Sequence, residues 1–268
     1  MANYFKHKRV WITGASSGIG EALALAFAAE NAHLVLSSRK ERDLEQVANA
    51  CTAAGAASAS IQVLDLANHA SLPEIADSVL KTFGKIDVLV NNGGISQRAL
   101  AIDTDLSIDK RLMDINYFGT IALTKAVLPS MLTHQLGHIV VISSLTGKFG
   151  APLRSAYAAS KHALHGFFDC LRIELGEAPI YISMICPGYV KTNVSINALT
   201  GDGSAQGTMD PSTGAGMDPA NLAQKILNAV RTKKEEAVFG GKETLGVYLK
   251  RFFPKFFSNM MKKRSLKA

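Results

Sequence analysis

Short apolar runs alternate with longer stretches of helical periodicity along almost the whole chain. The run from Ile139 to Ile142 has no polar residue, which suits a strand that helices cover on both faces. Repeated strand–helix units of this length predict a three-layer, doubly wound (Rossmann-type) parallel sheet, an α/β fold, with about seven strands. The expected strands are Arg9–Thr13, His33–Ser38, Ser58–Val63, Asp87–Asn91, His138–Ser143, Ile180–Pro187 and Ala237–Phe239. The main helical stretches are Gly20–Glu30, Arg42–Ala54, Leu72–Phe83, Asp109–Thr133, Ser155–Gly176 and Pro219–Arg231.

Two segments depart from this alternation. Asn193–Asp218 is rich in Gly, Ser and Thr and lacks periodicity. Because it is too long for an ordinary connection, it predicts a functional or mobile loop. No linker divides the chain, and 268 residues lie within the range of one large α/β domain. We therefore expect a single domain over 1–241 that includes the loop at 193–218, followed by a basic aromatic extension at 242–268.

A glycine-rich turn, Thr13–Gly20, follows the first expected strand and opens the first helix. Its glycines permit a tight turn and let the backbone approach a pyrophosphate closely, while the helix N-terminus supplies free N–H groups. The spacing is Gly-x3-Gly-x-Gly rather than the commoner Gly-x-Gly-x2-Gly, so a turn that serves only packing is the alternative. Its position as the first strand-to-helix turn favours a dinucleotide site.

The second strand is expected to end near the adenosine ribose of the dinucleotide. Enzymes that select NAD usually carry an acidic side chain there, which accepts a hydrogen bond from the ribose 2′-hydroxyl. Here Ser38 stands at that position and Arg39 follows it, with no carboxylate. Because a guanidinium pairs well with a phosphate, we predict NADP(H) in preference to NAD(H). The alternative is that Arg39 is a solvated loop charge.

Tyr157 and Lys161 lie four residues apart in a helical stretch, so their side chains share one face. An adjacent ammonium stabilises a phenolate and lowers the pKa of the phenol, which makes it a better general acid and base. The spacing alone is common, and a surface pair is the alternative. Ser144, at the end of the preceding strand, is placed to bond a substrate oxygen, and Asn116 lies in an earlier helix. Ser143 is the second candidate for the serine role, but its register directs its side chain away.

The order of these motifs resembles that of the short-chain dehydrogenase/reductase superfamily over essentially the whole chain. The resemblance implies a catalytic set in which Tyr157 protonates a carbonyl oxygen or takes a hydroxyl proton. Lys161 would lower the tyrosine pKa and hold the nicotinamide ribose, Ser144 would orient the substrate oxygen beside Tyr157, and Asn116 would hold a water that carries protons. The residues that carry the resemblance are Thr13–Gly20, Asn91-Asn92-Gly93-Gly94, Asn116, Ser144, Tyr157, Lys161 and Pro187-Gly188.

The same resemblance implies that 1–241 is a dinucleotide-binding and catalytic domain with a substrate loop at 193–218. It also implies a set of cofactor contacts. Asp65 and Leu66 would flank the adenine, and Asn92 and Gly93 would support the cofactor from the fourth strand. The family usually has alanine where this chain has Gly93, a difference of one methyl group. The expected cofactor-binding residues are Gly14, Ser16, Ser17, Gly18, Ile19, Gly20, Ser38, Arg39, Asp65, Leu66, Asn92, Gly93, Tyr157, Lys161, Pro187, Gly188, Val190 and Thr192.

Within the superfamily, Asn91–Arg98 and Ser160–Asp169 look most like the dehydrogenase/reductase member 7 group, near the 11β-hydroxysteroid dehydrogenases. This likeness implies a lipophilic carbonyl or alcohol substrate, such as a steroid, a retinoid or a related lipid. In the superfamily the helices that correspond to Asp109–Thr133 and Ser155–Gly176 usually form the subunit interface. A homodimer or homotetramer is therefore expected.

Several classes of protein do not fit the composition. No window reaches the roughly 18 consecutive apolar residues of a membrane-spanning helix, and the basic start Met1–Arg9 leads into too short an apolar run for a signal peptide. The three cysteines form neither a disulfide framework nor a metal-ligand spacing. We therefore expect no metal and a cytoplasmic location.

The positive charge of the chain is concentrated at its C-terminal end. The formal net charge is +7, and 242–268 holds eight Lys or Arg against one acid, which leaves the remainder neutral. Nucleic acid is therefore not an expected partner. Aromatic pairs lie among these cations, and Pro254 would divide any helix there. Two interpretations of this segment remain open. It makes peripheral contact with an anionic membrane surface, or its aromatic side chains close the substrate pocket or form a dimer contact.

The leading hypothesis is an NADPH-dependent carbonyl reductase that is reversible as an alcohol dehydrogenase. The competing hypotheses are a catalytically silent NADP(H)-binding regulator and a membrane-surface scaffold on the same fold. Such regulators commonly lose the tyrosine or the lysine, whereas Asn116, Ser144, Tyr157 and Lys161 are all present here.

Overall fold

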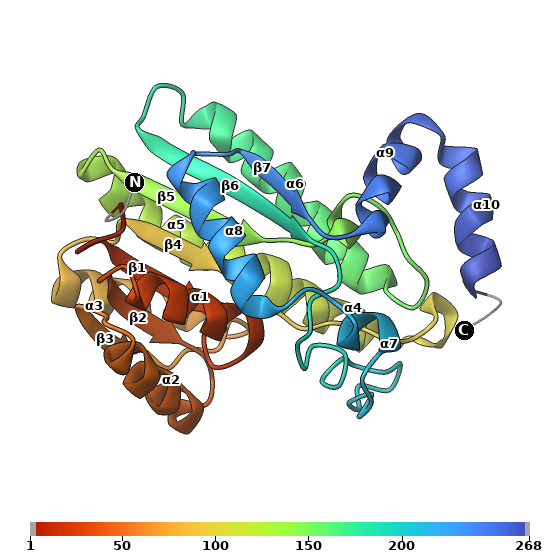
Figure 1. Cartoon of the computed structure of the whole chain (residues 1–268), viewed down its shortest axis with the longest axis horizontal. Coiled ribbons are helices and arrows are strands. Elements are labelled where there is room, and N and C mark those ends of the chain that lie inside the picture. Colours follow the sequence, from red (N-terminus) through yellow and green to blue (C-terminus); the bar gives the residue numbers. More distant parts are fainter. Residues whose placement is uncertain (1–3, 266–268) are drawn as a thin grey trace.

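Seven parallel strands form one sheet in the computed structural model, which describes residues 4–265 (Figure 1). Their spatial order is β3-β2-β1-β4-β5-β6-β7. The predicted three-layer, doubly wound Rossmann-type fold is confirmed, as a single domain. The strands are β1 (Arg9–Thr13), β2 (His33–Ser37), β3 (Ser58–Ile61), β4 (Val88–Asn91), β5 (Gly137–Ile142), β6 (Ile180–Pro187) and β7 (Glu236–Phe239).

Alternate side chains of the strands supply two separate cores, one on each face of the sheet. In β1, Val10 and Ile12 enter one core while Trp11 enters the other, and all three are fully buried. This alternation follows from the two-residue period of a strand, and it explains why the strand sequences are apolar throughout. One face is covered by α1 (Gly18–Ala28), α2 (Glu41–Ala53) and α8 (Pro219–Arg231), and the other by α3 (Leu72–Phe83), α5 (Gly119–Thr133) and α6 (Ser155–Glu174).

Most predicted boundaries agree with the structure to within two residues, but the prediction of one continuous α-helix over Asp109–Thr133 was wrong. The helix begins earlier, as α4 (Leu106–Met113), and passes through a π-helical turn at Asp114–Phe118 before α5. Such turns occur mostly as single bulges and often near functional sites. Asn116 lies within this turn and is completely buried.

The strand order places a topological switch point between β1 and β4. From β1 the chain builds outward to β2 and β3, and then crosses back to add β4 on the other side of β1. In doubly wound sheets, ligands bind outside the carboxyl ends of the strands at such a point. The sequence segments that follow β1, β4, β5 and β6 therefore meet at one edge.

The segment 193–218 is tied to the body of the protein rather than detached from it. It contains the short helix α7 (Pro211–Gly214), and its Leu199 exchanges backbone hydrogen bonds with Ser96 and Arg98. Short 3₁₀ turns complete the fold at His69–Ser71, Ala101–Asp103, Leu145–Gly147 and Lys242–Thr244.

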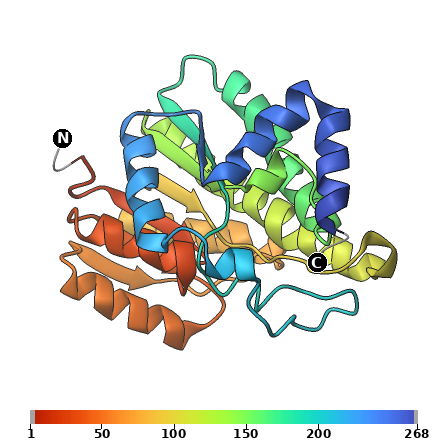
Figure 2. The ribbon, with the colours of Figure 1, turned by 45° about the vertical axis from the view of Figure 1, so that its right-hand side comes forward.

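The C-terminal extension forms two helices, α9 (Leu245–Phe252) and α10 (Pro254–Ser265). Pro254 separates them, as the sequence predicted, because proline cannot continue the hydrogen bonding of a helix interior. Figures 1 and 2 show the pair side by side at one end of the molecule. Residues 266–268 of the extension and 1–3 of the basic start lie outside the described residues. Within 4–265, no helix is both long enough and apolar enough to cross a membrane.

Candidate active site

A cavity of about 1080 Å³ lies outside the carboxyl ends of the strands. All but two of the residues expected at the site line it. The two exceptions, Gly20 and Asn116, lie beneath its surface. The expected residues that line it are Gly14, Ser16, Ser17, Gly18, Ile19, Ser38, Arg39, Asp65, Leu66, Asn92, Gly93, Ser144, Tyr157, Lys161, Pro187, Gly188, Val190 and Thr192.

The turn from β1 into α1 has the geometry of an anion site. Gly14 has a φ of +62°, a left-handed conformation that favours glycine. A Cβ on Gly20 would overlap the backbone oxygen of Gly14, so only glycine fits there. Ser17 makes no side-chain cap to α1, which leaves the N–H groups of the first helical turn available. These features fit a dinucleotide pyrophosphate.

Thr13 and Asn92 connect this turn to the end of β4. The Thr13 hydroxyl accepts hydrogen bonds from the backbone N–H groups of Asn92 and Gly93, at 3.0 and 2.9 Å. The Asn92 amide donates back to the carbonyl oxygens of Thr13 and Gly14, at 2.9 and 3.1 Å. Asn92 therefore fixes the turn. The sequence placed Thr13 at the start of this turn but did not indicate that its hydroxyl supports the end of β4.

Gly93 tolerates the alanine that is usual at this position. A Cβ there would lie 2.6 Å from Leu66 Cδ1. Because that atom ends a flexible side chain, a small rotation of Leu66 would relieve the contact. The departure from the family pattern therefore does not disturb the cofactor site.

The part of the cavity outside the carboxyl end of β2 is lined by Ser38, Arg39, Lys40 and Asp43. Arg39 is exposed, so its guanidinium is free to meet a ligand phosphate. Ser38 accepts a hydrogen bond from the Lys40 backbone at 3.2 Å, which holds the loop after β2. No acidic residue replaces Ser38 at the strand end, but Asp43 lines the same region, 3.8 Å from Lys40 Nζ.

Tyr157, Lys161 and Ser144 meet at the opposite end of the cavity. Tyr157 and Lys161 project from α6, and Ser144 follows β5. Lys161 Nζ donates to the Ile142 carbonyl oxygen at 2.8 Å and lies 5.8 Å from the centre of the Tyr157 ring. A hydrogen bond joins the side chains of Ser144 and Tyr157. A serine hydroxyl and a phenol therefore converge on one point of the cavity.

The pKa of Tyr157 differs from the prediction that the Lys161 ammonium lowers it. Burial raises the pKa of Tyr157, because the charged phenolate is poorly solvated there. The hydrogen bond with Ser144 and the positive charges of Arg98 and Arg154 act in the opposite direction. The lysine itself is affected by the same burial, which lowers the pKa of Lys161 to about 8.

The buried lysine gives a test of stability against pH. The pKa of Lys161 is lower in the folded chain than the ordinary 10.5 of an unfolded lysine, so the charged form destabilises the fold below pH 8. Lys161→Met should raise the free energy of unfolding by up to about 3 kcal/mol near pH 7, and this gain should shrink between pH 8 and 10.5. Urea unfolding across this range measures it. The exposed Lys225→Met is the control, and a gain that does not change with pH would contradict the assignment.

The Asn116 side chain makes three hydrogen bonds to neighbouring groups. Its carboxamide accepts from Ile95 N at 2.8 Å and donates to Ile95 O and to Ser160 Oγ, each at 3.0 Å. The side chain does not line the cavity. It connects the π-helical turn to α6 and to the turn after β4, and its role in holding a water stays a prediction.

Ser143 also lines the cavity, but its hydroxyl contacts a side chain of α6. Its hydroxyl lies 3.0 Å from His165 Nε2. Cys186 Sγ lies 3.6 Å from the same nitrogen. Burial lowers the pKa of His165 to about 4 and raises that of Cys186 to about 12, so both side chains are neutral at pH 7. Among the described residues, no group of three or more His, Cys, Asp or Glu is arranged to hold a metal.

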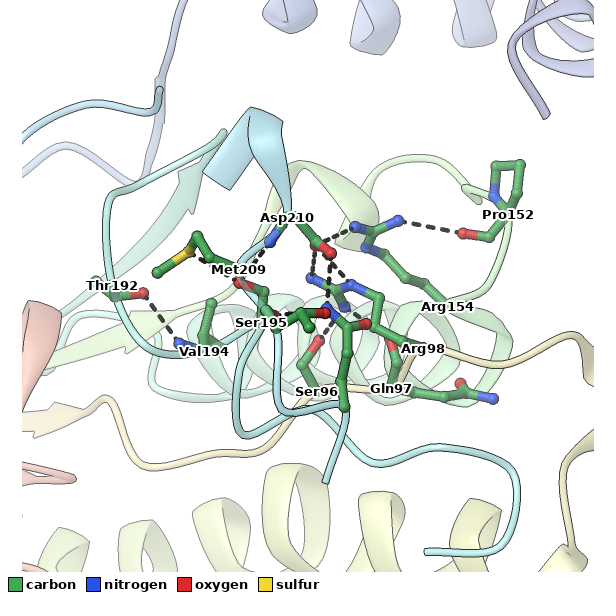
Figure 3. Close-up of polar contacts among 12 residues, drawn as sticks. Ser96, Gln97, Arg98, Pro152, Arg154, Thr192, Val194, Ser195, Met209 and Asp210 are labelled. Atoms are coloured by element: carbon green, nitrogen blue, oxygen red, sulfur yellow. Dashed lines mark hydrogen bonds and ion pairs between the residues drawn. The ribbon is translucent and has the colours of Figure 1, made fainter. Parts of the chain in front are cut away.

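Two arginines beside Tyr157 were not singled out from the sequence. Figure 3 shows Arg98 and Arg154 converging on Asp210 of the 193–218 segment. Nε and Nη2 of Arg98 each lie 2.7 Å from Asp210 Oδ2, and Arg154 Nη2 lies 3.2 Å from it. Burial raises the pKa of Asp210, but the hydrogen bonds from Arg98 and Gln206 and both positive charges hold it below its usual value. Two cations therefore face one carboxylate at the cavity wall.

Gln97 holds the start of the helix that carries Tyr157. The residue before this helix, Arg154, provides no side-chain cap. Instead, Gln97 Oε1 accepts from the backbone N–H groups of Ala156 and Tyr157, at 2.9 and 3.4 Å. Gln97 itself is completely buried and also donates to Thr104 and Ser155. This cap comes from 59 residues away, so local cap rules do not find it.

Comparison with known proteins places this geometry in context. A family model described as short chain dehydrogenase matches residues 8–202. The chain is 44% identical to bovine (Bos taurus) "Dehydrogenase/reductase SDR family member 7B" over 273 residues, covering 100% of this chain and 84% of that protein. It is 42% identical to a Drosophila melanogaster "Dehydrogenase/reductase SDR family protein 7-like", covering 99% and 82%.

Two solved structures have a similar fold. A short-chain dehydrogenase/reductase from Burkholderia phymatum in complex with NAD superposes with a TM-score of 0.83 at 24% identity, covering 94% of this chain and 95% of that one. An alcohol dehydrogenase from Thermococcus sibiricus complexed with 5-hydroxy-NADP has a TM-score of 0.76 at 25% identity, covering 88% and 97%.

Proposed function

This chain belongs to the short-chain dehydrogenase/reductase family, and from that premise we propose that it is an NADP(H)-dependent oxidoreductase that interconverts a carbonyl and a secondary alcohol. The observation that carries the proposal is the convergence of Tyr157, Ser144 and Lys161 at one end of a cavity whose other end is the glycine turn. Because both line the same cavity, a dinucleotide could bind its pyrophosphate at the turn and present its nicotinamide to the phenol.

The residues divide the reaction between them. The nicotinamide, when bound, would supply or accept the hydride. Tyr157 is the general acid in reduction and the general base in oxidation, and the Ser144 hydroxyl orients the substrate oxygen beside it. Lys161 holds the ribose hydroxyls of the nicotinamide half and, as an ammonium, favours the phenolate that remains after proton transfer. Asn116 acts as a positioning residue through Ile95 and Ser160.

The preference for NADP(H) rests on the loop after β2. Arg39 lines the cavity and is exposed, and no acidic side chain stands at Ser38 to accept from a 2′-hydroxyl. A 2′-phosphate would gain a charge-assisted bond to Arg39. Pro187, Gly188, Val190 and Thr192 line the nicotinamide side.

The wall of the cavity carries both an apolar cluster and charged side chains beside Tyr157. Leu145, Phe149 and Phe257 form a buried cluster at the wall, which favours a lipophilic substrate such as a steroid, a retinoid or a lipid ketone. The two positive charges of Arg98 and Arg154 exceed the one negative charge of Asp210. The excess positive charge beside Tyr157 favours a substrate whose polar end accepts hydrogen bonds or is negatively charged. An NADPH-oxidation screen of steroids, retinals, 3-keto acyl compounds and aromatic ketones, each with and without an anionic group, tests both features.

The 193–218 segment is proposed to close over the nicotinamide and exclude water, with Asp210 as its attachment. Asp210→Asn should raise KM for the ketone about 10-fold while kcat changes little, since the partly exposed ion pairs restrain the segment without touching the reacting atoms. Steady-state kinetics measure the change, and limited proteolysis should cut more readily within 193–218.

The matched control for this variant is Asp202→Asn. Asp202 lies in the same segment but bonds only within its own turn, to Thr200 and Ser204. An Asp210→Asn enzyme with unchanged KM and unchanged proteolysis would remove the basis for the closing role.

A catalytically silent NADP(H)-binding regulator on this fold is the alternative function. Such a protein would bind NADPH and oxidise it with none of the ketones of the screen. We further propose a cytoplasmic protein that assembles as a homodimer or homotetramer. Sedimentation equilibrium tests the assembly, since a monomer at micromolar concentration would contradict it.

A further inference from the structure

We propose that the outer face of α9 and α10 docks on an anionic lipid surface, so that the wall of the substrate cavity is also the membrane contact. The proposal uses two observations about these helices. Their inner face belongs to the cavity, and their outer face carries exposed aromatic side chains among unpaired cations.

The inner face is packed against the catalytic body. Phe257 is buried, and its ring lies 5.2 Å from that of Phe149 in an edge-to-face contact. Leu249 and Met260 pack against the same cluster and line the cavity. This packing sets the orientation of both helices, so their outer face is fixed with respect to the cavity.

The outer face carries large apolar side chains that no part of the described chain covers. On α9 the four-residue spacing of Tyr248 and Phe252 places them on one side of the helix. Phe253 and Phe256 continue the set at the junction and on α10. Each of the four is between 61% and 68% exposed, and none of them lines the cavity. Concentrated aromatic exposure of this kind marks an interaction surface.

The charge of this face identifies the partner. Within residues 4–265, the exposed cations of the extension form no ion pair with a carboxylate. Those on α9 and α10 are Lys250, Arg251, Lys255, Lys262 and Lys263. Lys242 precedes α9 and lines the cavity. Aromatic rings suit the boundary between head groups and acyl chains, and each cation near an anionic surface adds attraction. A second copy of this chain would bring the same positive charge and be repelled, so lipid is the better match.

Because α9 and α10 form part of the cavity wall, their docking would place the substrate cavity next to the membrane. This consequence rests on the proposed function. A lipophilic substrate dissolved in the bilayer would lie next to the cavity wall formed by Leu249, Phe257 and Met260. It would then pass into the cavity with a short path through water.

The test is co-sedimentation of the full chain with vesicles of phosphatidylcholine alone or with about one-third phosphatidylserine. We expect binding at low salt to the anionic vesicles, and weaker binding as salt rises. Phe252→Ser/Phe253→Ser/Phe256→Ser and Lys250→Glu/Arg251→Glu/Lys255→Glu should each weaken binding at least about 10-fold. None of these six residues lines the cavity.

The control for the aromatic variant is Ile102→Ser/Ile173→Ser, which removes exposed apolar side chains elsewhere. The control for the charge variant is Lys81→Glu/Lys225→Glu/Lys234→Glu, which makes the same charge change at other exposed lysines. Absence of binding by the wild-type chain, or equal losses in the controls, would overturn the proposal. The proposal would also be overturned if the wild-type chain bound no lipid and formed an oligomer that the triple serine variant converted to monomers. The exposed aromatic side chains would then form a subunit contact. NADPH binding is measured in parallel by fluorescence and shows that each variant is folded. It also distinguishes a failure of lipid docking from a failure of the proposed function.

Discussion

Tyr157→Phe should lower kcat for ketone reduction by about 10²–10⁴-fold, the range that a positioned general acid contributes. The substitution removes one oxygen, the atom that bonds with Ser144, and leaves the ring that packs beside Leu112 and Leu199 in the cluster around α4 and α6. Affinity for NADPH should therefore change by no more than a few-fold. Stopped-flow reduction of a ketone found in the screen measures the rate, and fluorescence titration measures the binding.

Tyr181→Phe provides the matched control for this variant. Tyr181 lies near the opposite end of β6 from the cavity, and its hydroxyl accepts from Lys233 at 2.7 Å. Its removal should leave turnover unchanged. If Tyr157→Phe kept more than about a tenth of the wild-type rate, the phenol would not be the proton donor, because general acid catalysis is worth more than that.

Arg39→Asp should reverse the cofactor preference. The change removes a cation that would bond the 2′-phosphate and places there a carboxylate, which repels the phosphate and accepts from a 2′-hydroxyl. We expect kcat/KM for NADPH to fall about 10–100-fold, since hydrogen bonds to charged groups are worth roughly 1.5–3 kcal/mol, and kcat/KM for NADH to rise. Initial rates at fixed ketone concentration, with each nucleotide varied, measure both.

The control for cofactor selection is Arg42→Asp, which makes the same change of charge in α2 at an exposed residue outside the cavity wall. It should leave the ratio of the two nucleotides within a few-fold of the wild type. A wild-type preference for NADH would contradict the assignment of Arg39 at the outset.

The sequence predicts those features of the fold and site that depend on local patterns. β1 and β6 were located to the residue because a buried parallel strand is an unbroken apolar run between polar segments. The turn from Gly14 to Gly20 and the pair Tyr157 and Lys161 were found because their spacing within one segment fixes their geometry. The family resemblance then added Ser144 and Asn116.

The features that were missed depend on contacts between distant segments. Gln97 caps a helix that begins 58 residues later in the chain, and nothing in its neighbourhood marks it as a cap. The contact of Arg98 and Arg154 with Asp210 was missed because it forms only when three distant segments of the chain meet. The π-helical turn around Asn116 was missed because one extra residue per turn does not disturb the apolar pattern of a long helix enough to be seen.

The contact between Arg98, Arg154 and Asp210 also has a consequence for the order in which the protein folds. Asp210 is 112 residues from Arg98 and 56 residues from Arg154 along the chain. Contacts with such large sequence separation form late, because their loop-closure entropy is offset only when much of the chain is already in place. During synthesis, β1 to β6 leave the ribosome before Asp210 does, so the sheet can assemble while the two arginines still lack their carboxylate. The catalytic cavity is therefore among the last parts of the molecule to reach its final shape.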